Sequence, residues 1–261
     1  MKECTCLIGL DPPESTMLAA QIDTPVMIHP TMPAVQVRGG ELYVQRPNAL
    51  SFMRVTRVIY HGIFEDDLDL IAALTLWGGP CLPNARGMLD CRLKLPCLAR
   101  AMAVSRYASP RGYAAPDTAY PATGEMVAKW GNWHCGENKA RFQETYRAEE
   151  ATIIEPYFEG SAVRLFVMGN RAWQIALEGE DWLKSIHADD ADIMAIDQGL
   201  LDDTRTIGEV FGLEMLANDY IVGQDGQKHL LEVNHIPNVT RFEEIRDAFI
   251  EFAADWAASA S

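Results

Sequence analysis

The chain has 261 residues, of which 48% are hydrophobic, so it can build a packed core without disulfides or structural metals. It carries 37 acidic and 22 basic residues, a formal net charge of −15, which argues against general nucleic-acid binding because that requires clustered Lys and Arg. Residues 1–143 hold 14 basic and 13 acidic residues, whereas residues 144–261 hold 8 and 24. This asymmetry indicates lobes with different tasks.

The sequence gives no indication of a membrane span or an export signal. Asp11 closes a short apolar run near the N-terminus, and the longest uncharged run, residues 70–85, is interrupted by Gly78, Gly79 and Pro80. The six cysteines lack the spacing of zinc or thioredoxin motifs. We therefore expect a cytoplasmic protein with reduced thiols and no membrane partner.

The first 80 residues predict a small α/β lobe. Strands and helices alternate, and they are expected at residues 6–10, 14–22, 25–28, 58–60 and 64–77. A hairpin is expected at residues 35–44, because Gly39 and Gly40 supply the positive φ of a tight turn. Helical spacing then continues over residues 88–104, with Pro96 as a break or a helix start, and residues 109–121 are typical of a connector.

From Met126 onward the pattern is mainly that of strands. They are expected at residues 126–130, 152–157, 162–168, 171–177, 215–222 and 228–233. Two helices are predicted in this part, one over residues 193–211, ended by Gly212, and one from Thr240 onward with an apolar stripe that packs in the core.

Asp219 and the later Glu232-Val233-Asn234 form a candidate metal site. If residues 216–222 and 229–233 pair as a hairpin, the three polar side chains can share one face, because alternate residues of a strand point the same way. Two carboxylates and an amide oxygen suit Mg²⁺. Alone, the same residues also fit a polar strand edge that faces solvent.

Two further features have the chemistry of a phosphate and nucleotide site. Lys129 leads into the glycine-containing residues 131–136, where backbone N–H groups and the lysine could hold phosphates, although a plain hairpin loop also fits. In residues 155–164, an exposed strand end could pair with an adenine edge, and Arg164 could reach a phosphate. Alone, that segment is also typical of a surface hairpin.

The order of these features resembles the ATP-grasp superfamily, in particular glutathione synthetase, D-alanine–D-alanine ligase and the ribosomal-protein glutamate ligases. The resemblance covers nearly the whole chain. It implies an α+β fold of α/β lobes: a shortened pre-ATP-grasp lobe over residues 1–83, linker helices and a central subdomain over 84–155, and a C-terminal subdomain with the metal site over 156–261.

By that resemblance, the site residues have defined roles. Lys94 and Lys129 match the two nucleotide lysines, and Arg164 matches an arginine near the phosphates. The interlobe hinge that binds adenine matches Glu155, Pro156, Tyr157, Phe158 and Glu159. The magnesium ligands match Asp219, Glu232 and Asn234. Arg164, Lys129 and Arg241 are the predicted catalytic residues, with Arg241 holding the acceptor carboxylate.

The chain departs from the family pattern at two places. Ala162 stands where an acidic residue often holds the ribose, and Glu159 is a candidate substitute. The phosphate loop carries Trp133, His134 and Cys135, for which packing or lid contacts are expected rather than nucleophilic chemistry. His235 could assist deprotonation, although a structural histidine is the favoured interpretation, and Lys184 is a candidate substrate contact.

The resemblance implies an ATP-dependent carboxylate–amine ligase that releases ADP and phosphate. It uses ATP and two Mg²⁺ ions, with Mn²⁺ as an alternative. Its partners are carboxylate and amine substrates, small molecules or peptides, and a second copy in a homodimer. Two alternatives stay open: an ATP-grasp phosphotransferase, and a nucleotide-binding regulatory protein that has lost catalysis.

Overall fold

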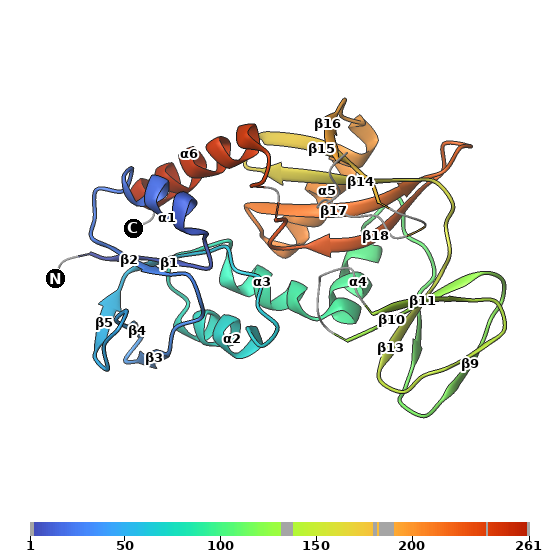
Figure 1. Cartoon of the computed structure of the whole chain (residues 1–261), viewed down its shortest axis with the longest axis horizontal. Coiled ribbons are helices and arrows are strands. Elements are labelled where there is room, and N and C mark those ends of the chain that lie inside the picture. Colours follow the sequence, from blue (N-terminus) through green and yellow to red (C-terminus); the bar gives the residue numbers. More distant parts are fainter. Residues whose placement is uncertain (1–2, 132–137, 180–181, 183–190, 239, 260–261) are drawn as a thin grey trace.

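A computed structural model describes residues 3–131, 138–179, 182, 191–238 and 240–259. This part of the chain has a parallel sheet near the N-terminus, a central antiparallel sheet, and a five-stranded antiparallel sheet near the C-terminus (Figure 1). Of its helices, none is long and apolar enough to cross a membrane. The five described cysteines are free thiols.

The N-terminal sheet has the strand order β2–β1–β6–β7 and is parallel throughout. Its strands are β1 (Thr5–Ile8), β2 (Val26–His29), β6 (Arg57–Tyr60) and β7 (Cys81–Leu82). Every residue of β1 and β6 is buried, as expected for a parallel sheet that is covered on both faces. The covering elements are α1 (Pro12–Ala19), α2 (Leu68–Trp77) and the antiparallel β3 (Val35–Arg38), β4 (Glu41–Gln45) and β5 (Phe52–Val55).

Two helices connect this lobe to the rest of the chain, α3 (Ala85–Arg92) and α4 (Lys94–Met102). The central sheet has the order β11–β10–β13–β8 and a two-stranded ribbon beside it. These strands are β8 (Gly112–Ala114), β9 (Ala119–Pro121), β10 (Met126–Trp130), β11 (Lys139–Phe142), β12 (Thr145–Arg147) and β13 (Thr152–Pro156).

The C-terminal sheet has the order β16–β15–β14–β17–β18. Its strands are β14 (Ser161–Met168), β15 (Arg171–Leu177), β16 (Asp192–Met194), β17 (Met215–Val222) and β18 (Lys228–Asn234). Helix α5 (Gln198–Phe211) packs on the face that carries Val163 and Leu165, and α6 (Glu243–Ser259) packs on the face that carries Phe166 and Ala217. Because α6 also packs against α1 and the N-terminal sheet, it joins the two lobes (Figure 1).

The structure confirms most predicted elements, including the hairpin, where Gly39 and Gly40 have φ of 59° and 74°. The prediction of one helix over residues 193–211 was wrong. Residues 192–194 form edge strand β16, and α5 begins only after Asp197, whose side chain accepts hydrogen bonds from the N–H groups of Gly199 and Leu200.

Two other expectations need correction. Residues 109–121 are not only a connector, because they contain β8 and β9, whose partners β13 and β12 lie far along the chain. The break within residues 88–104 falls at Leu93, which is extended with φ −99° and ψ 123°, and not at Pro96. A proline is tolerated at position 96 because it lies in the first turn of α4, where a backbone N–H group would have no acceptor within the helix. The predicted boundaries at residues 83 and 155 stay a prediction.

A buried polar network attaches α5 to the strand that carries Asp219. Asp203, which is 1% exposed, accepts hydrogen bonds from Ser105 Oγ (2.9 Å), Arg106 N (2.7 Å) and the Tyr220 hydroxyl (2.9 Å). Since these three donors belong to the segment after α4 and to β17, one carboxylate holds three parts of the chain together.

We predict that Asp203→Ala lowers the free energy of unfolding by about 2–4 kcal/mol, because the three donors lose their acceptor in the protein interior. Asp202→Ala is the matched control, since Asp202 accepts a hydrogen bond from Gln198 at an exposed position, and a change below about 0.5 kcal/mol is expected. Urea unfolding measures the change in the free energy of unfolding for both variants. Equal losses in the two variants would contradict the role of Asp203.

Candidate active site

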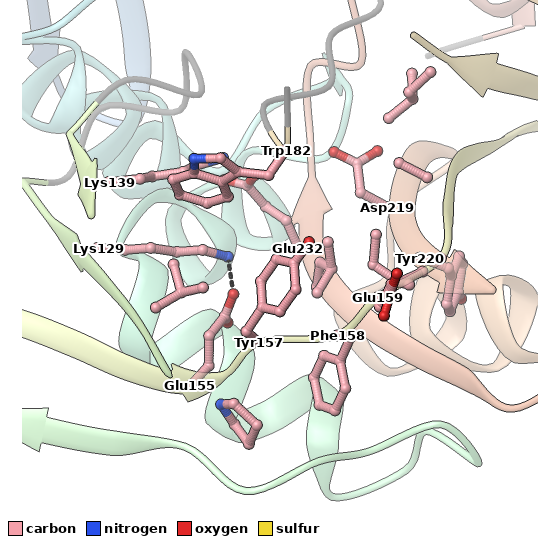
Figure 2. A pocket seen from close by; sticks show the side chains of 17 residues that line it. Lys129, Lys139, Glu155, Tyr157, Phe158, Glu159, Trp182, Asp219, Tyr220 and Glu232 are labelled. Carbon is pink, nitrogen blue, oxygen red and sulfur yellow. Dashed lines mark ion pairs between the residues drawn. The ribbon is translucent and has the colours of Figure 1, made fainter. Parts of the chain in front are cut away.

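The candidate site is a cavity between the central sheet and the C-terminal sheet (Figure 2). Apolar side chains from both sheets line it, namely Val127, Ala162, Leu177, Ile221 and Leu231. Its charged lining residues are Lys129, Lys139, Glu155, Glu159, Asp219 and Glu232. A cavity with apolar walls and a few charged side chains that point into it is typical of a ligand-binding site.

Glu155 lies between two cations at one end of the cavity. Its Oε1 is 2.5 Å from Lys129 Nζ, and its Oε2 is 3.0 Å from Arg111 Nε, although this second contact lacks hydrogen-bond geometry. Glu155 is 2% exposed. Burial lowers the pKa of Arg111, and the charge of Glu155 offsets part of this shift. The carboxylate therefore positions Lys129, so the side chain of Glu155 is committed to the two cations.

Lys94 and Lys129 lie around a second, smaller cavity that adjoins the first. Lys94 is at the start of α4, whereas Lys129 and Lys139 come from β10 and β11. All three lysines line this space together with Glu232. The structure thus brings Lys94 and Lys129, the two predicted nucleotide lysines, together beside Glu232, a predicted metal ligand. The two lysines are 35 positions apart in the sequence.

The register of the C-terminal sheet aligns the other predicted residues. Asp219 of β17 lies opposite Arg164 of β14 on one side and opposite Glu232 of β18 on the other. Asn234 lies opposite Ala217, two residues from Asp219, so it shares the same face. The expected pairing of β17 and β18 is therefore confirmed, and it places Arg164, Asp219, Glu232 and Asn234 on one face.

Arg164 holds Asp219 in a bidentate ion pair. Its Nε and Nη2 donate to Asp219 Oδ1 and Oδ2 at 2.7 and 2.9 Å, and its Nη1 donates to the Pro237 carbonyl at 2.7 Å. Burial lowers the pKa of Arg164, but Asp219 raises it and the net shift is upward, so the guanidinium stays charged. Within the described part of the chain, three of its five N–H groups donate hydrogen bonds, and the other two could serve an anion.

The donor set fits Mg²⁺. Asn234 Nδ2 donates to Asp219 Oδ2 at 3.3 Å, which leaves the amide oxygen of Asn234 available beside two carboxylates. Hard oxygen ligands of this kind suit Mg²⁺ better than softer metals. The described residues contain no cluster of three or more His, Cys, Asp or Glu side chains at metal-binding distance, so a magnesium site here would rest on two carboxylates and one amide.

The predicted hinge begins in the last two residues of β13 and forms the aromatic end of the cavity. Phe158 stacks on His229, with ring centroids 3.7 Å apart, and burial lowers the pKa of His229 so that the ring is neutral near pH 7. The Arg141 guanidinium carbon lies 3.9 Å from the centre of the Tyr157 ring. The Tyr157 and Trp182 rings meet edge to face, with their centroids 6.4 Å apart (Figure 2). Pro156 and Glu159 complete the hinge lining.

Other predicted residues lie elsewhere or outside the described part of the chain. Arg241 is exposed, its guanidinium lies over the ring of Phe242, and it is not among the residues that line the cavity. His235 is buried and, together with Asn234, lines a separate small cavity. Four predicted residues lie outside the described part of the chain, namely Trp133, His134 and Cys135 of the phosphate loop and Lys184.

Sequence reasoning missed Lys139 and Arg111. Lys139 could have been found by pairing the segment after the predicted loop with β10, because a hairpin places it opposite Lys129. Arg111 lies in the proline- and glycine-rich connector, where nothing local indicates that its Nη2 donates to the Leu230 carbonyl at 2.7 Å.

No protein-family model matches the sequence, and the comparison with curated proteins found no match. The structure is similar to that of the ATP-grasp ligase PsnB bound to a precursor variant, Mg and ADP, with a TM-score of 0.67, 14% identity, and coverage of 97% of this chain and 98% of that one. It is also similar to D-alanyl-alanine synthetase A of Vibrio cholerae, with a TM-score of 0.66, 13% identity, and coverage of 99% and 98%. The chain has the ATP-grasp fold.

A third similar structure is the macrocyclase MdnC of Microcystis aeruginosa bound to its precursor peptide, with a TM-score of 0.62, 15% identity, and coverage of 95% and 98%. Since these similarities extend over nearly the full length of both chains, they confirm the fold predicted from the order of the sequence motifs. Within the ATP-grasp fold, the cavity lies between its central and C-terminal sheets.

We predict that Glu155→Ala lowers the free energy of unfolding by about 3–5 kcal/mol, because two buried cations lose their shared carboxylate. Glu159→Ala is the matched control, since Glu159 is exposed at the cavity rim, and a change below about 0.5 kcal/mol is expected. Chemical denaturation measures both variants. A Glu155→Ala variant as stable as the control would show that the two cations do not need this carboxylate.

Proposed function

We propose that the protein is an ATP- and Mg²⁺-dependent carboxylate–amine ligase that forms an acyl phosphate and releases ADP and phosphate. The observation that carries this proposal is the convergence of Lys94, Lys129 and Glu232 around one space in an ATP-grasp fold. The similar structures support it, because they are described as ATP-grasp ligases with ADP and Mg and as a D-alanyl-alanine synthetase.

The nucleotide would lie along the cavity. Its apolar walls, among them Val127, Ile221 and Leu231, suit the faces of an adenine ring, and the hinge after Glu155 offers backbone groups to the ring edge. The phosphates would then reach Lys94 and Lys129, whose charges offset those of the phosphate oxygens. With Ala162 in the wall, Glu159 at the rim is the carboxylate that could hold the ribose hydroxyls.

Asp219, Glu232 and Asn234 would hold Mg²⁺, which neutralises phosphate charge when it is bound. Arg164 keeps the Asp219 carboxylate in place and offers its two remaining N–H groups to the transferred phosphate. The protein therefore acts mainly by positioning and by electrostatic stabilisation.

The chemistry needs no covalent enzyme intermediate. A carboxylate oxygen of the acid attacks the γ-phosphorus of ATP, and the bond from that phosphorus to ADP breaks. The amine nitrogen then attacks the acyl carbon, inorganic phosphate leaves, and the nitrogen loses a proton. His235 is buried and lines a separate small cavity, which favours a structural role over that of the acceptor of this proton. Arg241 is proposed to meet the acceptor carboxylate from the same loop.

The proposal is tested by release of ADP and phosphate from ATP in the presence of amino acids, small dicarboxylates and peptides, with product masses as the second readout. A peptide panel is included because PsnB and MdnC are described in complexes with precursor peptides. Phosphate and ADP that appear only when acid and amine are both present support a ligase. Phosphate retained on a product would indicate a phosphotransferase, and ATP binding without turnover would indicate a regulatory protein.

We predict that Glu232→Gln lowers kcat at least about 100-fold and raises the Mg²⁺ concentration needed for half-maximal turnover, because one carboxylate ligand becomes a neutral amide. Excess Mg²⁺ should restore part of the rate. Glu209→Gln is the matched control, since Glu209 is exposed on α5, and it should keep the parental rate. Full activity of Glu232→Gln at low Mg²⁺ would overturn the metal assignment.

We predict that Lys129→Ala raises the Kd for ATP at least about tenfold, because a phosphate loses a buried cation. Adenosine, which has no phosphates, should bind equally to the wild-type protein and to Lys129→Ala. Lys228→Ala is the control, since Lys228 pairs with Asp197 outside the cavity. Calorimetry measures the affinities, and unchanged ATP binding would show that the phosphates lie elsewhere.

A further inference from the structure

Lys139 occupies an electrostatically unfavourable position. In the antiparallel pair β10–β11 it lies directly opposite Lys129, so the two side chains leave the sheet on the same face (Figure 2). Like charges directly opposite each other on a sheet are destabilising. A lysine at this position therefore costs stability in the ligand-free protein.

The surrounding charges do not remove this cost. Lys129 is paired with Glu155, and Asp219 is paired with Arg164. Among the described residues, none forms an ion pair with Lys139. Burial lowers the pKa of Lys139, the neighbouring Lys129 lowers it further, and Glu232, Asp219 and Glu155 offset part of the shift from a distance.

The location of Lys139 indicates what relieves the repulsion. Lys139 lines both the main cavity and the smaller space around Lys94, and Lys129 and Glu232 also line both. Lys139 therefore lies where the proposed site passes from apolar walls to the lysine cluster. An anion with several charges, bound between Lys94 and Lys129, would lie beside a third cation.

We propose that Lys139 is a third phosphate-binding lysine, which makes the site selective for nucleotides with a long phosphate chain. This inference rests on the proposed use of ATP and deepens it by assigning a specificity residue that the sequence motifs do not include. Lys139 offers a point charge with three N–H donors to the phosphate oxygens. The negative charge of a bound phosphate would offset the repulsion between Lys139 and Lys129.

The experiment compares Lys139→Gln, Lys139→Arg and the control Lys228→Gln with the wild-type protein. The probes are Mg·ATP, Mg·ADP, adenosine and tripolyphosphate, and calorimetry measures each Kd. For Lys139→Gln we expect the Kd for Mg·ATP and for tripolyphosphate to rise at least about tenfold, a smaller rise for Mg·ADP, and no change for adenosine. Lys139→Arg should restore most of the affinity, and Lys228→Gln should match wild type.

Thermal unfolding without ligand gives a second readout. Lys139→Gln should unfold at the same or a higher temperature than wild type, because it removes the repulsion from Lys129. A lower unfolding temperature together with weaker adenosine binding would show that Lys139 has a structural role, and would overturn the inference.

Two other results decide the remaining cases. If wild type binds Mg·ATP and Lys139→Gln binds it equally well, or if only the KM for the acid substrate changes, Lys139 is not a phosphate residue while the proposed function stands. If wild type binds no Mg·ATP, the proposed function and this inference both fail.

Discussion

The site depends on the register of three antiparallel strands. Because Arg164, Asp219 and Glu232 lie opposite one another on β14, β17 and β18, a slip of one residue would turn a strand's polar side chains to the opposite face. That face is already filled by α5 and by the buried network of Asp203 and Tyr220. The packing that anchors α5 therefore also holds the carboxylates toward the cavity.

The charged residues of the cavity are arranged in compensated groups. Glu155 lies between Lys129 and Arg111, and Asp219 accepts two hydrogen bonds from the Nε and Nη2 groups of Arg164. Burying a charge carries a desolvation penalty, so such ion pairs contribute little net stability. Removing one partner is strongly destabilising, because the other charge then stays buried without compensation. These pairs restrict the side chains to one arrangement. Lys139, which lacks such a partner among the described residues, stands apart from this pattern.

The charge asymmetry of the chain corresponds to the two sides of the cavity. The three lysines that surround the smaller space, Lys94, Lys129 and Lys139, belong to residues 1–143, where acidic and basic residues balance. Asp219 and Glu232 belong to the acidic remainder. A polyanion in the cavity would thus meet cations from the linker and central sheet, and it would face carboxylates that need a metal to become attractive.

The sequence by itself determined most of the elements and the pairing that aligns Asp219 with Glu232, because hydrophobic period and glycine turns are local signals that survive without tertiary context. The ATP-grasp fold followed from the resemblance carried by the order of the sequence motifs, and the similar structures confirm it. Seven of the described strands were not predicted, namely β5, β7, β8, β9, β11, β12 and β16. Each is short and lies at the edge of its sheet, where pairing with a partner strand outweighs the local sequence pattern. Only the tertiary structure decided that Arg111 and Lys129 share Glu155 and that Lys139 faces Lys129. Ion pairs and repulsions of this kind depend on distances between side chains far apart in sequence, which spacing along the chain does not encode.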